Sequence, residues 1–210
     1  MIDQFEKLPA SEQQKIIKVC IEEFGDKGYT RASTNTIVKN AGIPKGTLFY
    51  FFENKKNLFL YLVDHAVERY IEFVETYTED LPPDLFDRLL YMFEVRMRFT
   101  VHAPHLYRFF FRTLLNVPDE LKADMRDRFE SYTAASRDLM SEGVDVSRLR
   151  EGISVDQVME LISYFMEGLL ARHTENLAKL DADQSLAYVQ NMLGQGTLYF
   201  EMLKQGVYSK

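Results

Sequence analysis

The residues best suited to binding chemistry lie in one short stretch of the chain. Residues 45–52 read Lys-Gly-Thr-Leu-Phe-Tyr-Phe-Phe, and two more lysines follow at positions 55 and 56. Four consecutive aromatic rings cover all sides of a helix, so some of them must face outward. Lysine supplies charge to phosphate groups, Thr and Tyr hydroxyls bond to phosphate oxygens, and rings contact thymine methyl groups. This combination favours a nucleic-acid groove as the binding partner.

Two short helices joined by a tight turn are expected to position these residues. A helix capped by Ser33 should end at Gly42, and Pro44 starts a second helix over residues 45–52. Such a short connector is what a helix-turn-helix requires. The N-termini of both helices offer free N–H groups to phosphates, and Gly46 lets the backbone approach DNA closely.

Residues 41–58, AGIPKGTLFYFFENKKNL, resemble the helix-turn-helix of tetracycline-repressor (TetR/AcrR) family regulators. That family shows Ala-Gly-Val-Ser-Lys-Gly-Thr-Leu-Tyr-x-His/Tyr-Phe-x-x-Lys-x-x-Leu, and the resemblance extends over about residues 13–59. Phe49 replaces the family's usual Tyr and Phe51 its His or Tyr, so apolar contacts would take the place of hydrogen bonds there. The resemblance implies that DNA is bound by Ser33, Thr34, Lys45, Gly46, Thr47, Phe49, Tyr50, Phe51 and Lys55. Among these, Lys45, Gly46 and Thr47 would lie nearest base edges, and Lys55 would bind phosphate.

The rest of the chain also predicts helices, because no segment alternates with period two over a useful length. Capping boxes are expected at Ser11 with Gln14 and at Ser154 with Gln157, and a cap at Asp183. The fold class is therefore all-α. The resemblance implies an N-terminal three-helix helix-turn-helix DNA-binding domain, residues 1–54, and a C-terminal helical-bundle domain for effector binding and dimerisation, residues 55–210. The helices are expected at residues 11–28, 33–41, 45–52, 55–77, 86–101, 104–115, 118–141, 154–178 and 183–204.

The formal net charge of −7 argues by itself against a nucleic-acid partner, but it is unevenly distributed. Residues 1–58 hold nine Lys and Arg against seven Asp and Glu, a net charge of +2. The remaining residues hold 16 against 25, a net charge of −9. The acidic part should repel DNA, so contact with DNA would be confined to the two recognition helices of a dimer.

A dimer is expected because one helix-turn-helix reads few base pairs, and this family binds a palindromic operator as a homodimer. The last two predicted helices carry the apolar residues for that interface: Val158, Ile162, Phe165, Leu169, Val189, Leu193, Gly196 and Phe200. Gly194 and Gly196 within a helix favour a close helix–helix approach, or else a looser, kinked helix end.

Regulation in this family comes from a small-molecule effector that binds in the helical domain. An excess of aromatic and Met residues predicts a largely hydrophobic effector. Its pocket would be lined by Phe93, Met97, Phe110, Phe111, Phe129, Tyr132, Tyr164 and Phe165. Taken one at a time, however, each of these residues is expected to pack in the hydrophobic core and not to contact a ligand. A polar stripe either holds an anionic head group or, as we favour, pairs with carboxylates: Arg98, His102, His105, Arg108 and Arg112.

Other function classes find little support in the sequence. No Glu-x-x-His pair, Gly-x-Ser-x-Gly elbow or phosphate loop is present, so we expect no enzyme, no catalytic residues, no cofactor and no metal. The single cysteine, Cys20, lies in an apolar stripe and should be buried. Without a signal or membrane-spanning segment we expect a cytoplasmic regulator. A repressor is favoured over an activator, and a protein-binding adaptor is a more distant alternative.

Overall fold

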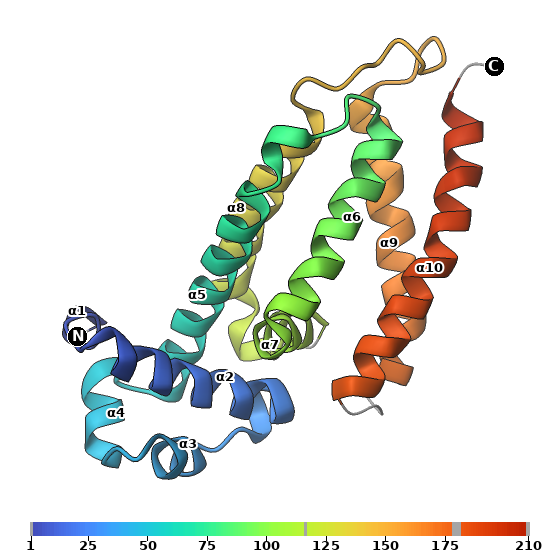
Figure 1. Ribbon diagram of the computed structural model, residues 1–210. Coiled ribbons are helices and arrows are strands. Elements are labelled where there is room, and N and C mark those ends of the chain that lie inside the picture. The colour runs from blue at the N-terminus through green and yellow to red at the C-terminus, as the bar shows by residue number, and fades with distance from the viewer. Residues whose placement is uncertain (1, 116, 178–181, 209–210) are drawn as a thin grey trace. The chain divides into compact units, whose positions relative to one another are not determined.

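In a computed structural model the chain is all-helical, as predicted, and it contains no strand within the described residues, 2–115, 117–177 and 182–208 (Figure 1). Within η1 and α6–α10 only some of the side chains are described. The elements are α1 (Ile2–Phe5), α2 (Ala10–Arg31), α3 (Thr34–Ala41), α4 (Lys45–Phe52), α5 (Lys55–Glu75), η1 (Thr78–Asp80), α6 (Leu85–His102), α7 (Pro104–Leu115), η2 (Asp119–Leu121), α8 (Lys122–Ser141), α9 (Val155–Leu177) and α10 (Ala182–Val207).

The helices form two compact units that divide the chain differently from the predicted 1–54 and 55–210 domains. The first unit holds residues 1–73 and 99–132, and the second holds residues 74–98 and 133–210. The helix-turn-helix helices therefore share one unit with α7 and with parts of α5, α6 and α8. The functional division into a DNA-binding part and an effector part stays a prediction.

The beginning of the chain differs from the sequence prediction. α2 starts at Ala10, with Pro9 at its N-cap position and no side-chain cap, so the predicted Ser11–Gln14 capping box is wrong. The side chain of Gln13 instead donates to the backbone carbonyls of Glu6 and Leu8, at 2.9 and 2.8 Å. These bonds hold a turn that brings α1, an element that the hydrophobic pattern did not predict, against α4.

Aromatic rings form much of the core of the first unit. The ring centroids of Phe24 and Phe59 lie 5.2 Å apart, and those of Phe59 and Phe109 lie 5.5 Å apart, which joins α2, α5 and α7. Cys20 is fully buried, as predicted, and burial raises the pKa of its thiol to about 12. The thiol is therefore a protonated, apolar part of the core at physiological pH.

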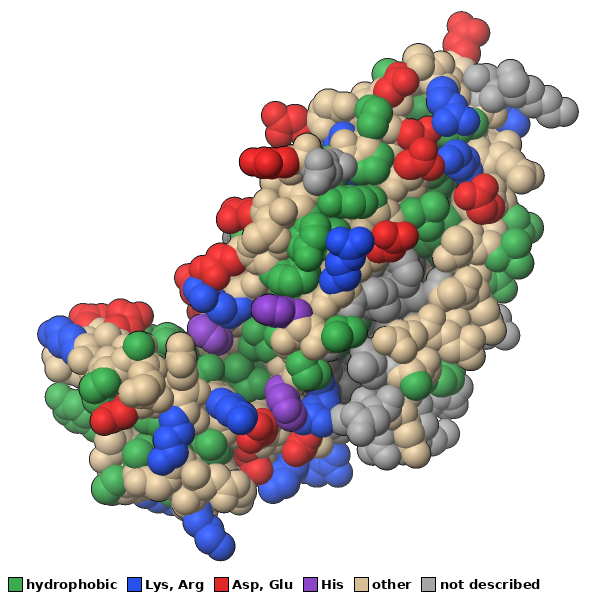
Figure 2. Space-filling model, in the orientation of Figure 1, with side chains coloured by type: hydrophobic (Ala, Val, Ile, Leu, Met, Phe, Trp, Pro, Cys, Tyr) green, Lys and Arg blue, Asp and Glu red, His purple; other side chains and the backbone are tan. Residues whose placement is uncertain are grey.

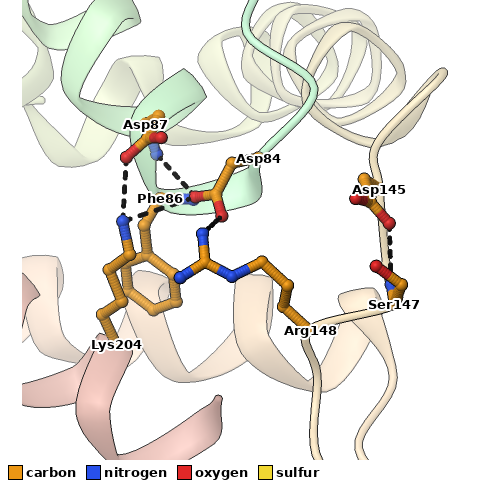
Figure 3. A network of polar contacts seen from close by, with 7 residues as sticks. All are labelled: Asp84, Phe86, Asp87, Asp145, Ser147, Arg148 and Lys204. Carbon is orange, nitrogen blue, oxygen red and sulfur yellow. Dashed lines mark hydrogen bonds and ion pairs between the residues drawn. The ribbon is translucent and has the colours of Figure 1, made fainter. Parts of the chain in front are cut away.

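In the second unit, a network of ion pairs and hydrogen bonds surrounds the start of α6 (Figure 3). Asp84 accepts bonds from the backbone N–H groups of Phe86 and Asp87 at 3.0 and 3.1 Å. Arg148 pairs with the same carboxylate at 2.6 Å, and Lys204 of α10 reaches both Asp84 and Asp87, at 3.6 and 2.8 Å. The network thus ties the last turn of α10 and the loop before α9 to the first turn of α6.

The predicted caps of the last two helices have different outcomes. The capping box before α9 is confirmed, because the backbone N–H of Gln157 donates to the Ser154 hydroxyl and that of Ser154 to the Gln157 amide oxygen. The predicted Asp183 cap is wrong, because α10 already begins at Ala182. Within the described ranges, none of the helices combines the length and the apolar character needed to cross a membrane.

Candidate nucleic-acid interface

The joint between α2 and α3 fixes where the first of the two short helices starts. Gly28, at φ 69° and ψ 171°, interrupts the regular dihedrals of α2 with a backbone conformation that only glycine adopts readily. Ser33 then caps α3 by accepting from the backbone N–H of Thr36 at 3.4 Å, as predicted. The Ser33 N–H itself donates to the carboxylate of Glu23 at 2.8 Å, which also binds Lys27 at 2.8 Å. Sequence reasoning missed Glu23, because nothing in the pattern distinguishes it from the neighbouring Glu22.

The turn between α3 and α4 has the predicted helix-turn-helix form. Gly42 ends α3 in the left-handed conformation, φ 70° and ψ 33°. The N–H of Ile43 returns to the carbonyl of Val38 at 3.1 Å, and the carbonyl of Pro44 accepts from Thr47 at 3.0 Å. Backbone hydrogen bonds thus hold the C-terminal end of α3 and the first turn of α4, and α4 spans the predicted residues 45–52.

α4 presents a distinct outer face that contains most of the predicted DNA-binding residues. Lys45 and Gly46 are exposed, the Tyr50 ring is 59% exposed, and Thr47 and Phe49 are partly exposed. The ammonium of Lys45 lies 5.8 Å from the centre of the Phe49 ring. Ser33 and Thr34 at the start of α3 are also partly exposed. Figure 2 shows Lys and Arg side chains on the surface of this N-terminal part of the chain.

Phe51 does not belong to the outer face. Its side chain is 6% exposed, and its ring meets that of Phe5 edge-on with centroids 5.5 Å apart. Phe52 is buried, and Leu48 is buried as expected. The ring of Phe51 is therefore covered from within the protomer, and we leave it out of the DNA-binding surface proposed below.

Lys55 also lies differently from the simple phosphate contact that was expected. Its ammonium donates to the carbonyl of Thr30 at 3.2 Å and lies 4.9 Å from the centre of the Tyr29 ring. Burial lowers the pKa of Lys55, while the carboxylates of Glu120 and Glu23 act in the opposite direction. Its neighbour Lys56 pairs with Asp124 at 2.7 Å. Both lysines thus also hold α5 to other helices of the first unit.

The predicted effector-lining residues are only partly described. The side chains of Phe93, Met97, Phe111, Phe129 and Tyr132 lie outside the described residues. Phe110 is buried in the first unit and stacks against Tyr70 at 6.1 Å. In the second unit, Tyr164 is 62% exposed and bonds to Glu160, while Phe165 packs against Tyr199 and Phe200.

The predicted dimer residues of α9 and α10 whose side chains are described are buried or partly buried. Val158 and Ile162 are buried beside Leu85 and Phe86 in the core of their own protomer, so they cannot form an outer surface. Phe165, Gly196 and Phe200 are partly or fully buried as well, and the side chains of Leu169, Val189 and Leu193 lie outside the described residues. Among the described side chains of α9 and α10, the large apolar ones that are exposed are instead Leu161, Tyr164, Leu198, Tyr199 and Met202.

The described side chains of the polar stripe contact other side chains of the same chain, although Arg98, His102 and His105 are exposed. Arg108 pairs with Asp26 at 2.8 Å and contacts the Nδ1 atom of His105 at 3.3 Å. Arg98 lies over the Tyr77 ring and 4.0 Å from Glu94, and the His102 ring packs against Phe73. The Arg112 side chain lies outside the described residues. Across the parts of the chain that the structure covers, no group of three His, Cys, Asp or Glu side chains is placed to hold a metal ion.

The two short helices α3 and α4, joined by a tight turn in an otherwise all-helical chain, have the form of a helix-turn-helix. Residues 16–62 match the model of bacterial regulatory proteins of the tetR family, and residues 83–196 match that of the tetracyclin repressor-like C-terminal domain. The chain belongs to the tetR family of transcriptional regulators.

Relatives and solved structures resemble the chain over most of its length. The probable acrEF/envCD operon repressor of Escherichia coli K12 is 24% identical over 190 residues, covering 86% of this chain and 84% of that protein. The transcriptional activator FasR of Mycolicibacterium smegmatis is 26% identical over 147 residues, covering 69% and 67%. The structure of FadR from Bacillus subtilis in complex with stearoyl-CoA shares 17% identity at a TM-score of 0.60, covering 93% of this chain and 99% of that one.

Proposed function

We propose that the chain binds a palindromic operator as a homodimer, represses transcription there, and is released by a largely hydrophobic effector. The observation that carries the DNA-binding part is the outer face of α4, where Lys45, Gly46, Thr47, Phe49 and Tyr50 are left accessible while Leu48 and Phe52 anchor the helix. Ser33, Thr34 and Lys55 complete the proposed contacts at its border.

The chemistry of α4 predicts how it reads DNA. The helix contains no Arg, Asn or Gln, so Lys45 is its one side chain of the types that make bidentate contacts to guanine or adenine. Its outer face offers one ammonium, two hydroxyls and two rings, which suit phosphates and thymine methyl groups. We therefore expect thymines opposite α4 in each half-site. Replacing one of them by deoxyuridine removes a methyl group worth about 0.8 kcal/mol, or about fourfold in affinity. An unchanged affinity at every thymine would contradict this mode of reading.

DNA binding itself is tested with a duplex selected from random sequence by the full-length protein. Affinity should fall steeply with salt, with a log–log slope of about −0.9 for each phosphate neutralised. Selection of no sequence, together with no binding to any duplex at low salt, would refute the proposed function. A reporter gene behind the selected site then distinguishes a repressor from an activator by the sign of the change on expression of the protein.

The proposed dimer uses the exposed apolar residues of α9 and α10. Leu198 and Met202 are 65% and 62% exposed and lie one helical turn apart on α10, next to Tyr199. Large exposed apolar side chains that cluster in this way mark an interaction surface. Analytical ultracentrifugation at micromolar concentration should show a dimer, and Leu198→Glu should convert it to a monomer. The control is Val146→Glu, at an exposed valine in the loop before α9. A monomeric wild-type protein would refute the dimer.

Release by an effector requires that the effector domain act on the DNA-binding helices, and the packing of α7 on α2 supplies a route. A Cβ atom at Gly25 would lie 3.6 Å from the Phe109 backbone, so the two helices approach closely. Arg108 and Asp26 pair across the same joint. A displacement of α7 would thus move α2. We propose that effector binding favours a conformer whose recognition helices are wrongly spaced for the operator.

Stearoyl-CoA is the first effector to test, because FadR binds it and because the sequence predicts a mainly apolar ligand. If it is an effector, it should weaken operator binding, and the operator should weaken stearoyl-CoA binding by the same factor. Stearate and free coenzyme A, tested separately, show which half of the molecule is recognised. An effect of coenzyme A alone would contradict a hydrophobic effector.

A further inference from the structure

The four-residue helix α1 covers the inner side of the recognition helix α4 with a single ring. Phe5 is 0% exposed, and its ring lies among three others. The centroid distances are 5.5 Å to Phe51, 4.9 Å to Phe52 and 5.6 Å to Tyr61 of α5. Phe5 therefore contacts two of the three residues that α4 buries, and it joins them to α5.

The segment that carries Phe5 is held in place from α2. Both side-chain hydrogen bonds of Gln13 end on this segment, at the carbonyls of Glu6 and Leu8, and the Leu8 N–H donates to the carbonyl of Phe5 at 3.0 Å. The other α1 side chains are exposed, with Ile2 at 38%. We call this segment, residues 2–8, the arm. The buried Phe5 ring is its apolar anchor, and the two Gln13 hydrogen bonds are its polar clamp.

α4 depends on such external support. A helix of eight residues is too short to be stable by itself in water, so its orientation follows from the elements against which it packs. Those elements include α1 and α3, and also α5, where the Tyr61 ring lies 5.2 Å from that of Phe52. The match to the family model begins at residue 16, so the arm lies outside it. The Phe at position 51, where the family usually has His or Tyr, has an apolar partner in Phe5.

We propose that Phe5 is a positioning residue for DNA binding, which holds the inner side of α4 against α5 so that the outer face keeps the orientation that fits the major groove. This inference rests on the proposed function and adds a segment that the family likeness does not assign. Without the ring, α4 would populate the binding-competent orientation only in part, and apparent affinity falls by that populated fraction. A competent fraction of about one tenth in the variant corresponds to an affinity about tenfold weaker per half-site.

The test compares three variants of the full chain on the duplex selected by the wild-type protein. Phe5→Ala should weaken binding about tenfold or more, while Phe5→Leu, which refills most of the space, should restore most of the affinity. Ile2→Ala is the control on the same helix and should bind like the wild type. Hydrogen exchange supplies the readout that a general loss of stability would not give: the amides of α4 should exchange faster in Phe5→Ala, while those of α9 stay unchanged. If Phe5→Ala does not fold, Gln13→Ala, which releases the clamp, takes its place.

The inference and the proposed function fail in different ways. If the wild-type protein selects no DNA, the proposed function is refuted. If the wild type binds but Phe5→Ala binds equally well, or if exchange in that variant rises equally in α4 and α9, the positioning role is refuted and DNA binding is untouched. Failure of Phe5→Leu to regain affinity over Phe5→Ala also counts against positioning by packing.

Discussion

Substituting Glu23 tests whether the start of α3 depends on one buried carboxylate. Glu23 is 7% exposed, and a single oxygen accepts from the Ser33 N–H and from the Lys27 ammonium, both at 2.8 Å. Glu23→Ala removes both contacts. Ser33, the cap of α3, then loses the bond that fixes it to α2, so the spacing of α3 from α2 is no longer held.

The magnitude follows from the two bonds. A hydrogen bond to a charged acceptor contributes about 1.5–3 kcal/mol. The pair with Lys27 adds less than about 1 kcal/mol, because the lysine side chain is 45% exposed and solvent screens it. We expect Glu23→Ala to lower the free energy of unfolding by about 2–4 kcal/mol. Glu23→Gln keeps an acceptor for Ser33 and should lose about 1 kcal/mol.

Urea unfolding followed by far-ultraviolet circular dichroism measures this loss, since the chain has no tryptophan to report it. The protein concentration must be equal for all variants, because a dimer is stabilised by mass action. Glu22→Ala is the control, since it removes the same charge from the neighbouring position. If Glu23→Ala and Glu22→Ala differ by less than about 0.5 kcal/mol, the carboxylate does not anchor α3 and the reasoning is refuted.

Three further predictions concern charge, strain and pH. Lys45→Ala should reduce the magnitude of the salt slope of operator binding by about 1.8, because each protomer loses one phosphate contact. Lys122→Ala, at an exposed lysine outside the helix-turn-helix, should leave the slope unchanged. Equal slopes for both variants would exclude Lys45 from contact with phosphate. Glu53, which follows α4, has φ 61° and ψ −51°, with the Asn54 N–H turned back to the Phe52 carbonyl at 2.6 Å. Glu53→Gly should relieve that strain and stabilise the fold by about 0.5–1 kcal/mol in urea unfolding, and a destabilised variant would contradict the strain. Burial acts to raise the pKa of the Asp84 carboxyl, but the bond from the Asp87 backbone and the charges of Lys204 and Arg148 act in the opposite direction, and the pKa is lowered. The resulting stability is fully present above the unfolded pKa, about 3.9, and is lost as the pH falls through the folded value. Asp84→Asn should therefore weaken the fall in the free energy of unfolding that is measured between about pH 5 and 2. An unchanged fall over this pH range would refute the contribution of Asp84.

The local part of the fold was predictable because its signals are short-range. The Ser33 cap, the helix end at Gly42 and the helix start after Pro44 depend only on backbone sterics and neighbouring hydrogen bonds, and the structure has them at the predicted residues. The Ser154–Gln157 capping box is confirmed for the same reason. Ser11 satisfied the same pattern without forming a box, because the helix already begins at Ala10, with Pro9 at its N-cap position.

Which side of a helix faces the core was harder to predict. Four consecutive rings in α4 showed that some must point outward, but not which, and the structure exposes Tyr50 while Phe5 covers Phe51. In α9 the most regular apolar stripe, with Val158 and Ile162, turned out to be the protomer's own core. A stripe shows that a face is buried, and it does not show whether the same chain or a second copy buries it.

The sequence by itself determined the helical class, the helix-turn-helix and its family, because these follow from periodicity and from residue types at fixed short spacings. Only the tertiary structure decided the partners of those elements. It placed Phe5 beneath α4, Glu23 against Ser33, and Lys55 on the Thr30 carbonyl. Residues 46 or 25 positions apart meet because the chain folds back, and the free energy of such contacts depends on burial and geometry that no local pattern records.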